Sequence, residues 1–104
     1  MFGIIYEYCD IRTGKSAYVG KAAGYSGHTK ALEKVHKRHL TAPTPVPFDL
    51  ILRADERAFT LRIIDTITAN TTVELQEILK PLEKVRIREH RPTHNHVRFI
   101  HFQA

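Results

Sequence analysis

The alternation of hydrophobic and polar positions predicts a β-hairpin at the start of the chain. Residues 3–9 alternate between two sets of side chains, as a strand does when successive residues face opposite sides of a sheet. Residues 10–15 follow with turn-forming side chains, and Gly14 can adopt the positive φ that a tight turn needs. The strand pattern then resumes and continues to Gly20. We therefore expect an antiparallel hairpin over residues 3–20.

The next part of the chain predicts a loop and a helix. Residues 21–28 contain glycine and alanine, and we expect a loop there. After Thr29, a candidate N-cap, apolar residues recur at helical spacing as far as Leu40. The prolines within residues 42–47 end this helix and favour an extended crossing, because proline cannot continue a helix.

Two further strands and a second long helix are expected downstream. Residues 48–53 and 58–67 are strand candidates separated by a polar turn. Residues 71–74, with the sequence Thr-Thr-Val-Glu, fit a capping box that opens a helix with its apolar residues on one side. Pro81 lies inside this helix, so we expect a kink there or a second helix that begins there.

The order of these elements predicts the fold class. Arg91 and Pro92 end the last helix, and residues 97–102 are a candidate for a short final strand. This order is typical of an α+β fold, with a small antiparallel β-sheet flanked by helices. A length of 104 residues allows one domain with one modest core, so we expect residues 1–104 to form a single domain.

The composition narrows the class of protein. The chain is 42% hydrophobic and 26% charged, as ordinary globular chains are. No apolar stretch approaches the roughly 20 residues that span a membrane, so we expect no membrane partner. The N-terminal residues lack a basic segment and a cleavage site, and the single cysteine, Cys9, cannot form an internal disulfide. We therefore expect a cytoplasmic protein.

The charge indicates the class of partner. The 16 Lys and Arg residues exceed the 11 Asp and Glu residues, which gives a formal net charge of +5 with neutral histidines. The sequence pI is about 9.6. A basic balance makes polyanions, nucleic acid among them, the first partners to consider.

Two segments carry a resemblance to a known family. Residues 3–6 are Gly-Ile-Ile-Tyr, and residues 18–22, on the returning strand, are Tyr-Val-Gly-Lys-Ala. Near the C-terminus, Glu83 is followed nine residues later by a proline and twelve residues later by an asparagine. Together these segments resemble the GIY-YIG nuclease family, and residues 59–65 resemble its third strand. The second segment has the spacing found in the nuclease domain of the bacterial excision-repair incision subunit.

The resemblance implies a metal-dependent endonuclease that hydrolyses DNA phosphodiester bonds. In the family the first tyrosine is the candidate general base, which corresponds here to Tyr6, and Tyr18 would help it to orient the attacking water. Glu83 would bind one Mg²⁺ or Mn²⁺ ion. Asn95 corresponds to the asparagine that supports the site in the family.

The residue types suit this chemistry. A carboxylate can hold Mg²⁺ while leaving coordination positions for waters and a phosphate. A tyrosine can orient or deprotonate water when a nearby cation lowers its pKa. Lys21 directly follows the second tripeptide and is a compact cation for the scissile phosphate. We expect Gly20 to leave space for the approach of the phosphate.

The position of the first tyrosine leaves an alternative open. The family motif has one hydrophobic residue between glycine and tyrosine, whereas two isoleucines separate Gly3 from Tyr6. Either Tyr6 or Ile5 therefore occupies the catalytic position, and we choose Tyr6. The interval from Tyr6 to Tyr18 then needs one extra residue in the turn.

The arginine of the family's first helix also has no clear counterpart. Val35, not arginine, lies four residues before His39, and an alignment without gaps places His28 at the arginine position. The role would pass to Arg38 or His36, and we choose Arg38. We expect Arg38, His39 and the lysine at position 21 to neutralise the phosphate.

Each candidate also has a purely structural interpretation. Tyr6 and Tyr18 would pack the hairpin as cross-strand aromatic residues, and Glu83 would be a solvated helix residue in an ion pair. The cations would be surface charges, His39 a partly buried side chain and Asn95 an ordinary turn residue. Four C-terminal histidines do not predict zinc, because no spaced cysteine or carboxylate set accompanies them; they are His90, His94, His96 and His101.

Two rival functions use the same sequence features. One is a non-catalytic nucleic-acid-binding module on the same fold, and the other is a protein-interaction domain without affinity for nucleic acid. A steep fall of affinity with salt would distinguish them, because Lys and Arg contacts to phosphates release counterions. A chain of 104 residues has no room for an added DNA-reading domain. Specificity would therefore be weak or structure-based, or would come from a homodimer or a partner protein.

Overall fold

A computed structural model describes residues 1–95 of the chain. It confirms the expected α+β class: a three-stranded antiparallel sheet is flanked by helices. The strand expected at residues 97–102 lies outside the described residues. The elements are β1 (Phe2–Asp10), β2 (Lys15–Gly24), α1 (His28–Thr41), α2 (Pro47–Ala54), a short 3-10 helix (Glu56–Ala58), β3 (Phe59–Thr68) and α3 (Thr72–His90).

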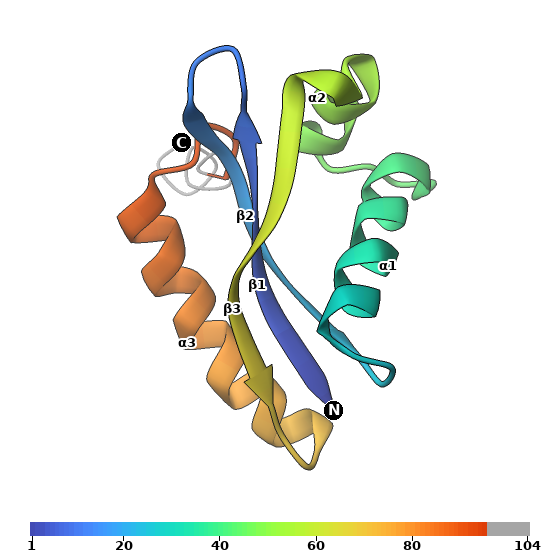
Figure 1. Cartoon of the computed structure of the whole chain (residues 1–104), viewed down its shortest axis with the longest axis vertical. Helices are drawn as coiled ribbons and strands as arrows, with labels where there is room; N and C mark the ends of the chain where they lie inside the picture. The colour runs from blue at the N-terminus through green and yellow to red at the C-terminus, as the bar shows by residue number, and fades with distance from the viewer. Residues whose placement is uncertain (96–104) are drawn as a thin grey trace.

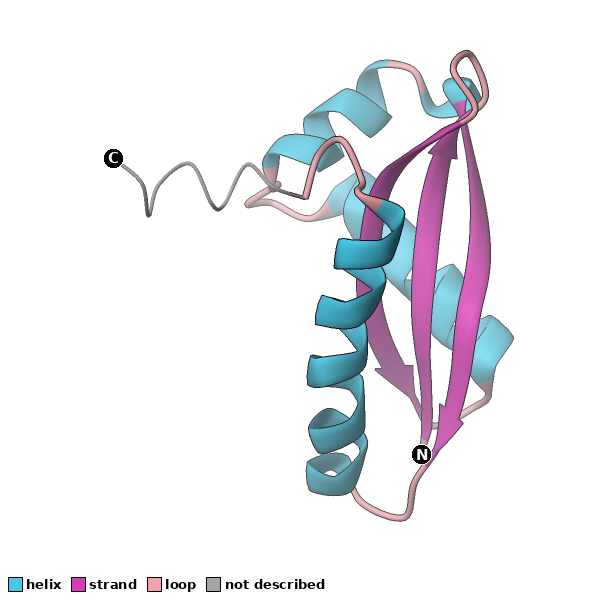
Figure 2. Cartoon of the chain, turned by 90° about the vertical axis from the view of Figure 1, so that its left-hand side faces the viewer, coloured by secondary structure: helices cyan, strands magenta, loops and turns pink. Residues whose placement is uncertain are grey.

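The sheet has the order β2-β1-β3, with β1 antiparallel to both of its neighbours. Helices cover both faces: α1 and α2 lie on one side of the sheet and α3 lies on the other (Figure 1). Figure 2 shows α3 in front of the sheet and parallel to its long direction. In the described part of the chain β2 is an edge strand, so helices from both faces can reach its outer side.

The alternation along β1 divides the core between the two faces. Side chains of one set pack with α1 and α2, and those of the other set pack with α3. The buried members of the first set in β1 are Ile4, Tyr6 and Tyr8. Ile5, between them, is buried with Leu75 and Leu79 of α3. The period of two in the sequence therefore decides which helix each β1 residue contacts.

The hairpin is confirmed, and the structure extends it. The second strand continues beyond Gly20 to Gly24, which pairs with Phe2, so residues 21–24 are strand rather than the expected loop. Gly14 has a φ of 73° in the turn, as expected. The hairpin is irregular in β2, because Tyr8 pairs with Tyr18 and Cys9 pairs with Ser16 across a bulge.

The strand expected at residues 48–53 is wrong, because this segment belongs to helix α2. Pro47 occupies the first helical turn, where its missing N–H is not needed. The Asp49 carboxylate accepts a hydrogen bond from the backbone N–H of Val46 at 3.1 Å and so caps the helix. A short apolar run does not distinguish a strand from a buried helix, which explains the error.

The N-terminus of α1 differs from the expectation, and the N-terminus of α3 agrees with it. Gly27, not Thr29, is the N-cap of α1. At α3 the predicted cap forms, because the Thr71 hydroxyl accepts a hydrogen bond from the backbone N–H of Glu74 at 3.1 Å. No second helix begins at Pro81, since α3 continues unbroken through it.

Across the described residues, no helix combines the length and the apolar character needed to cross a bilayer.

Candidate active site

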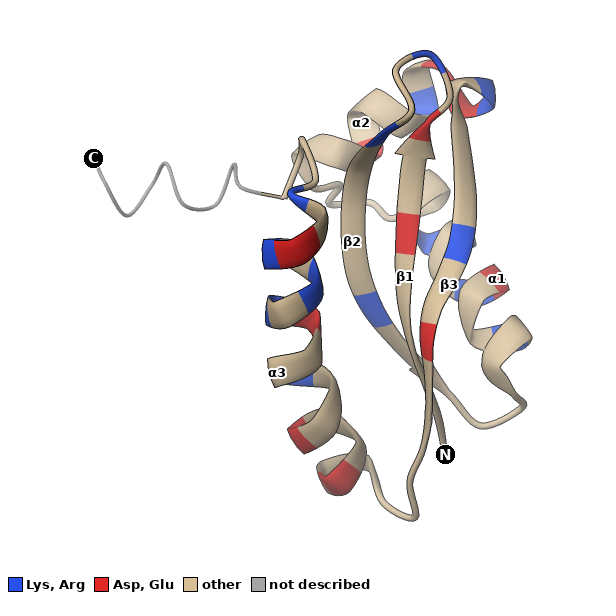
Figure 3. Ribbon diagram, turned by 60° about the vertical axis from the view of Figure 1, so that its left-hand side comes forward, with Lys and Arg blue, Asp and Glu red and all other residues tan. Residues whose placement is uncertain are grey.

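A pocket of about 470 Å³ at the outer side of β2 brings most of the predicted site residues together. Side chains from β1, β2, α1 and α3 line it, because α1 and α3 lie on opposite faces and both reach the β2 edge. Figure 3 shows α3 beside β2, with charged residues of both signs along the helix. Six of the seven predicted residues line the pocket: Tyr6, Tyr18, Lys21, Arg38, His39 and Glu83.

A chain of hydrogen bonds leads from the pocket into the core. The Tyr6 hydroxyl lies 2.6 Å from Nε2 of His39, and Nδ1 of His39 bonds to the Asp49 carboxylate. A carboxylate can only accept, so Nδ1 of His39 donates to it and Nε2 is left to accept from the tyrosine. All three side chains are buried. The chain therefore points the Tyr6 proton toward a histidine whose orientation is held by a carboxylate.

The protonation states of the first two groups follow from burial. Burial raises the pKa of Tyr6 well above its ordinary range, and the charges of Tyr18, Tyr8 and Glu83 raise it further, while Arg38 opposes them. Tyr6 is therefore a neutral donor at neutral pH. Burial also lowers the pKa of His39 below its ordinary 6.5, and the bond to Asp49 offsets part of that shift. His39 is accordingly neutral and able to accept a proton.

Ile5 is not the residue of the pocket. It lies on the α3 face with no exposed surface, whereas Tyr6 points to the α1 face and reaches the pocket. The geometry thus distinguishes the two alternatives left by the sequence and favours Tyr6.

Asp49 is the main site residue that the sequence analysis missed. It belongs to α2, which was predicted as a strand, so its proximity to His39 was not foreseen. The side chain has two functions, because one oxygen caps α2 and the other bonds to His39. A proline followed two residues later by an aspartate is typical of a helix start and would have indicated it.

Gly20 serves the site in a different way from the one expected. It pairs with Tyr6 across the β1–β2 ladder. A Cβ atom at this position would lie 2.6 Å from Cζ of Tyr6. The space above Gly20 is therefore occupied by the tyrosine ring, and the glycine allows Tyr6 to extend over β2 toward the pocket.

Tyr18 is held at the pocket by aromatic packing. Its ring stacks on Phe48 of α2 with centroids 4.9 Å apart and an interplanar angle of 10°. The centroids of Tyr18 and Tyr6 are 6.3 Å apart. Offset stacking of this kind restrains the ring of Tyr18, which lines the same pocket as Tyr6.

The cations of the pocket come from β2 and α1. Lys21 donates from Nζ to the side-chain oxygen of Gln76 on α3 at 2.8 Å. Arg38 lies in the last turn of α1, with an exposed side chain. The alternatives for the helix arginine lie elsewhere, because His36 bonds to the hydroxyl of Tyr8 and His28 bonds to a backbone carbonyl of β3. Among the three, Arg38 lines the pocket.

Asn95 does not line the pocket but is bonded to the strand that forms it. Its side-chain oxygen accepts from the Val19 N–H at 2.7 Å, and its side-chain nitrogen donates to the Val19 carbonyl at 2.7 Å. These two bonds satisfy the outer edge of β2 between Tyr18 and Gly20. Asn95 therefore acts on the site through the position of β2.

Two carboxylates line the pocket, and one of them, Asp49, holds His39 and the first turn of α2. The other, Glu83, is the candidate metal ligand that the sequence predicts. Within residues 1–95 no group of three or more His, Cys, Asp or Glu side chains could hold a metal ion. Mg²⁺ is commonly held by one or two carboxylates together with waters and substrate phosphates. A Mg²⁺ ion in this pocket would therefore have Glu83 as its protein carboxylate and would take its other ligands from waters and substrate.

Comparison with known proteins adds no family assignment. No family model, no curated protein and no solved structure matches this chain. The function must therefore be argued from the chemistry of the pocket itself.

Proposed function

We propose that the protein is a metal-dependent endonuclease that hydrolyses DNA phosphodiester bonds, as its resemblance to the GIY-YIG nucleases implies. The observation that carries the proposal is the hydrogen-bonded chain Tyr6–His39–Asp49, which ends in a pocket with cations and a carboxylate. Phosphodiester hydrolysis needs an acceptor for the proton of the attacking water and positive charge beside the phosphate. The pocket supplies groups of both kinds.

The hydrogen bonds that join Tyr6, His39 and Asp49 provide a route for the proton. As an O–H bond of the attacking water breaks, its proton passes to the Tyr6 oxygen, and the hydroxyl proton of Tyr6 passes to Nε2 of His39. The water oxygen bonds to phosphorus, and the bond from phosphorus to the departing oxygen breaks; that oxygen keeps the electron pair and takes a proton from solvent. Asp49 stabilises the imidazolium that forms. Tyr6 never has to exist as a free phenolate, which agrees with its raised pKa.

This scheme revises the role of His39. We expected it to neutralise the phosphate, but both of its ring nitrogens are bonded within the protein. It is 7% exposed, so a direct contact with phosphate would require loss of one of those bonds. His39 is instead the proton acceptor of the scheme.

The remaining pocket residues bind and orient the substrate. Lys21 and Arg38 place positive charge beside the phosphate, and Tyr18 orients the attacking water. Glu83 would hold Mg²⁺ or Mn²⁺, and the ion, when bound, supplies Lewis-acid charge at the phosphate. DNA recognition by this chain would be weak or structure-based, with further specificity from a homodimer or a partner protein.

Cleavage with matched glutamate variants tests the proposal. Supercoiled plasmid and end-labelled oligonucleotides are incubated with the protein and Mg²⁺ or Mn²⁺. We expect cleavage by the wild type and a loss of about 100-fold or more in Glu83→Ala, because several kcal/mol of charge stabilisation is removed. Glu77→Ala is the control, since Glu77 is an exposed residue on the same helix that does not line the pocket. Equal cleavage by the two variants would contradict the proposal.

A binding experiment separates the rival functions. Salt-dependent binding of DNA without cleavage in either metal would favour a non-catalytic nucleic-acid-binding module. Absence of salt-dependent binding would favour a protein-interaction domain. Either result overturns the proposed hydrolysis.

A further inference from the structure

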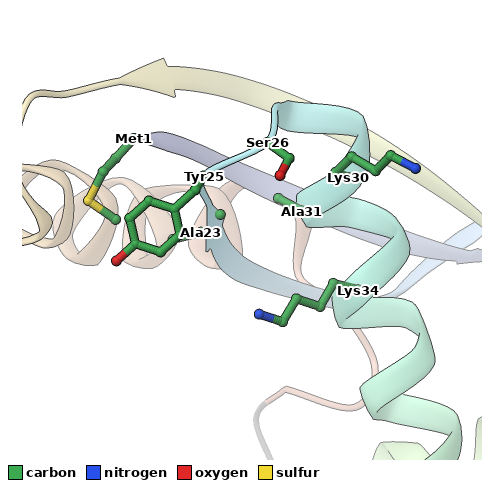
Figure 4. Close-up of a pocket in the computed structure, with 8 residues that line it drawn as sticks. Met1, Ala23, Tyr25, Ser26, Lys30, Ala31 and Lys34 are labelled. Atoms are coloured by element: carbon green, nitrogen blue, oxygen red, sulfur yellow. The ribbon is translucent and has the colours of Figure 1, made fainter.

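A groove continues from the candidate active site along β2 and α1. A second pocket, of about 330 Å³, shares Lys21 and Arg38 with the active-site pocket. A third pocket, of about 340 Å³, shares Ala23, Ala31 and Lys34 with the second. The three pockets are therefore contiguous. The groove runs toward the connection between β2 and α1, where Tyr25 lies (Figure 4).

The second pocket carries positive charge only. Its charged lining residues are Lys21, Lys34 and Arg38, and no Asp or Glu lines the second or the third pocket in the described part of the chain. Lys34 and Arg38 are four residues apart on α1 and so lie on the same side of the helix. Cations gathered in a concave surface without carboxylates attract polyanions.

The cations of the groove differ in what already binds them. Lys30 forms an ion pair with Glu33 at 3.5 Å, and its side chain extends away from Tyr25 in Figure 4. Lys34 and Arg38 form no ion pair within residues 1–95. Lys34 points into the space beside β2 (Figure 4). Its ammonium group is therefore the lysine charge available to a ligand beyond the active site.

Tyr25 adds an aromatic surface at the far end of the groove. It is 79% exposed, the most exposed of the large hydrophobic residues in the described chain. In Figure 4 its ring stands beside Met1 and Ala23, at the rim of the third pocket. An exposed aromatic ring next to a cationic track is the combination with which proteins hold unpaired bases.

We infer that this groove binds a single-stranded segment of the nucleic acid adjoining the scissile phosphate. Phosphates of the strand lie against Lys34 and Arg38, and one base stacks on Tyr25. Bases in a duplex are stacked on one another, so only an unpaired base presents its face to the ring. The inference rests on the proposed function for the placement of the scissile phosphate, and it narrows the substrate class to nucleic acid with a single-stranded arm.

A tryptophan reporter tests binding separately from cleavage. The chain has no tryptophan, so Tyr25→Trp introduces a single one. The variant is titrated with an oligothymidylate of eight nucleotides and with a duplex of the same length, in a chelator that prevents cleavage. We expect the single strand to quench the emission, because the base stacks on the indole, and the duplex to leave it unchanged. Equal quenching by both ligands overturns the inference.

The charge of Lys34 is tested against a matched lysine. Lys37 lies on the same helix, is exposed and lines none of the three pockets. We expect Lys34→Ala, with its natural Tyr25, to bind the oligothymidylate more weakly than the wild type does. The slope of log affinity against log salt should be smaller by about 0.7. Lys37→Ala should leave that slope unchanged. Equal slopes in the two variants contradict the inference.

Two substitutions at Tyr25 separate stacking from other effects. Tyr25→Phe retains the ring and should bind the oligothymidylate as the wild type does. Tyr25→Ala should lose about 5- to 150-fold in affinity, the range seen for base–aromatic stacking. Equal affinity of the Phe and Ala variants overturns the stacking contact. Binding as expected, combined with no cleavage in Mg²⁺ or Mn²⁺, supports the groove and overturns only the proposed hydrolysis.

Discussion

Tyr6 and Glu7 are adjacent in β1, and their side chains enter two polar clusters on opposite faces of the sheet. Each cluster pairs a histidine with a carboxylate, but the groups follow a different order. In the Tyr6 cluster the carboxylate is innermost, the histidine lies between, and a hydroxyl ends the chain at the pocket. In the Glu7 cluster the carboxylate is central and its donors surround it.

The Glu7 cluster is internally neutralised. The buried carboxylate accepts from Arg62 at 2.7 Å, from His90 at 2.7 Å and from the Cys9 thiol at 3.2 Å. Burial raises the pKa of Glu7, but the polar side chains around the carboxylate together lower it by more; they are Ser16, Cys9, Arg62 and His90. The cluster joins β1 to β3 and to the last turn of α3, which is a structural role.

The Tyr6 cluster presents a hydroxyl group to the pocket, where a ligand can reach it. Its histidine is buried and neutral, its tyrosine is at the pocket, and the cations Lys21 and Arg38 also line that pocket. The comparison shows that a His–carboxylate pair does not by itself indicate a functional site. Both clusters border a pocket, since Glu7, Arg62 and His90 line one of about 450 Å³. What differs is that the Glu7 carboxylate is already occupied by its donors, whereas the Tyr6 hydroxyl donates to His39 and can still accept a proton from a ligand.

The largest expected effect comes from removing the terminal hydroxyl. Tyr6→Phe keeps the ring but breaks the proton route, and we expect single-turnover cleavage to fall by about 10²- to 10⁴-fold. Tyr8→Phe is the matched control, because the Tyr8 hydroxyl bonds to a different histidine, His36, and does not line the pocket. Thermal unfolding of both variants checks that they fold. Similar cleavage rates in the two variants would mean that the Tyr6 hydroxyl has no role that the Tyr8 hydroxyl lacks, which would contradict the comparison.

The next effect comes from displacing Tyr6 without changing it. In Gly20→Ala the new methyl group enters the space of the Tyr6 ring, so the hydroxyl must move away from His39. We expect cleavage to fall at least about 10-fold and stability to fall by about 1–3 kcal/mol, the usual cost of overpacking. Gly24→Ala is the control for stability on the same strand, since its added Cβ would contact Ala31 at an ordinary 3.5 Å. Urea unfolding compares the two variants, and the cleavage rate of Gly20→Ala is compared with that of the wild type. Full activity in Gly20→Ala would mean that the position of Tyr6 is unimportant.

The Glu7 cluster should respond in stability and not in activity. Glu7→Gln removes the charge that accepts from Arg62 and His90, and we expect the free energy of unfolding to fall by about 1–3 kcal/mol. Because the folded pKa of Glu7 is lowered, its carboxylate stabilises the fold above the ordinary value of 4.5. That stabilisation is lost as the pH falls through the folded pKa, so the difference between variant and wild type should shrink in acid. Urea unfolding at neutral and acid pH measures it, and a large loss of cleavage by the folded variant would contradict the structural assignment.

The smallest expected effect is a shift in the pH dependence of the cleavage rate. His39 must be neutral to accept the proton, and its folded pKa lies below 6.5. Cleavage should therefore persist as the pH falls through 6.5 and decline only below it. Asp49→Asn removes an interaction that raises the pKa of His39. The variant should cleave more slowly, and the acid limb of its rate–pH profile should lie at still lower pH than that of the wild type. Single-turnover rates across the acid range provide the measurement, and an acid limb above 6.5 would exclude His39 as the acceptor.

Much of the fold was predictable from local patterns. The alternation in residues 3–9 determined the hairpin and the two faces of β1, and the Thr71 cap located the start of α3. The apolar run at residues 48–53 was misassigned, because its length suits a strand and a short helix equally. In the structure α2 packs Phe48 against Tyr18, a contact between residues distant in the sequence.

The sequence by itself identified several of the chemical groups that line the pocket, since Tyr6, Tyr18, Lys21 and Glu83 belong to the two motifs. Only the tertiary structure decided what those groups are bonded to. The packing of α2 against α1 brought Asp49 to His39, and the pairing of β1 with β2 placed Tyr6 over Gly20. The physical reason is that a residue type fixes its donors, acceptors and charge, whereas burial and bonded partners fix its pKa and the direction of its proton.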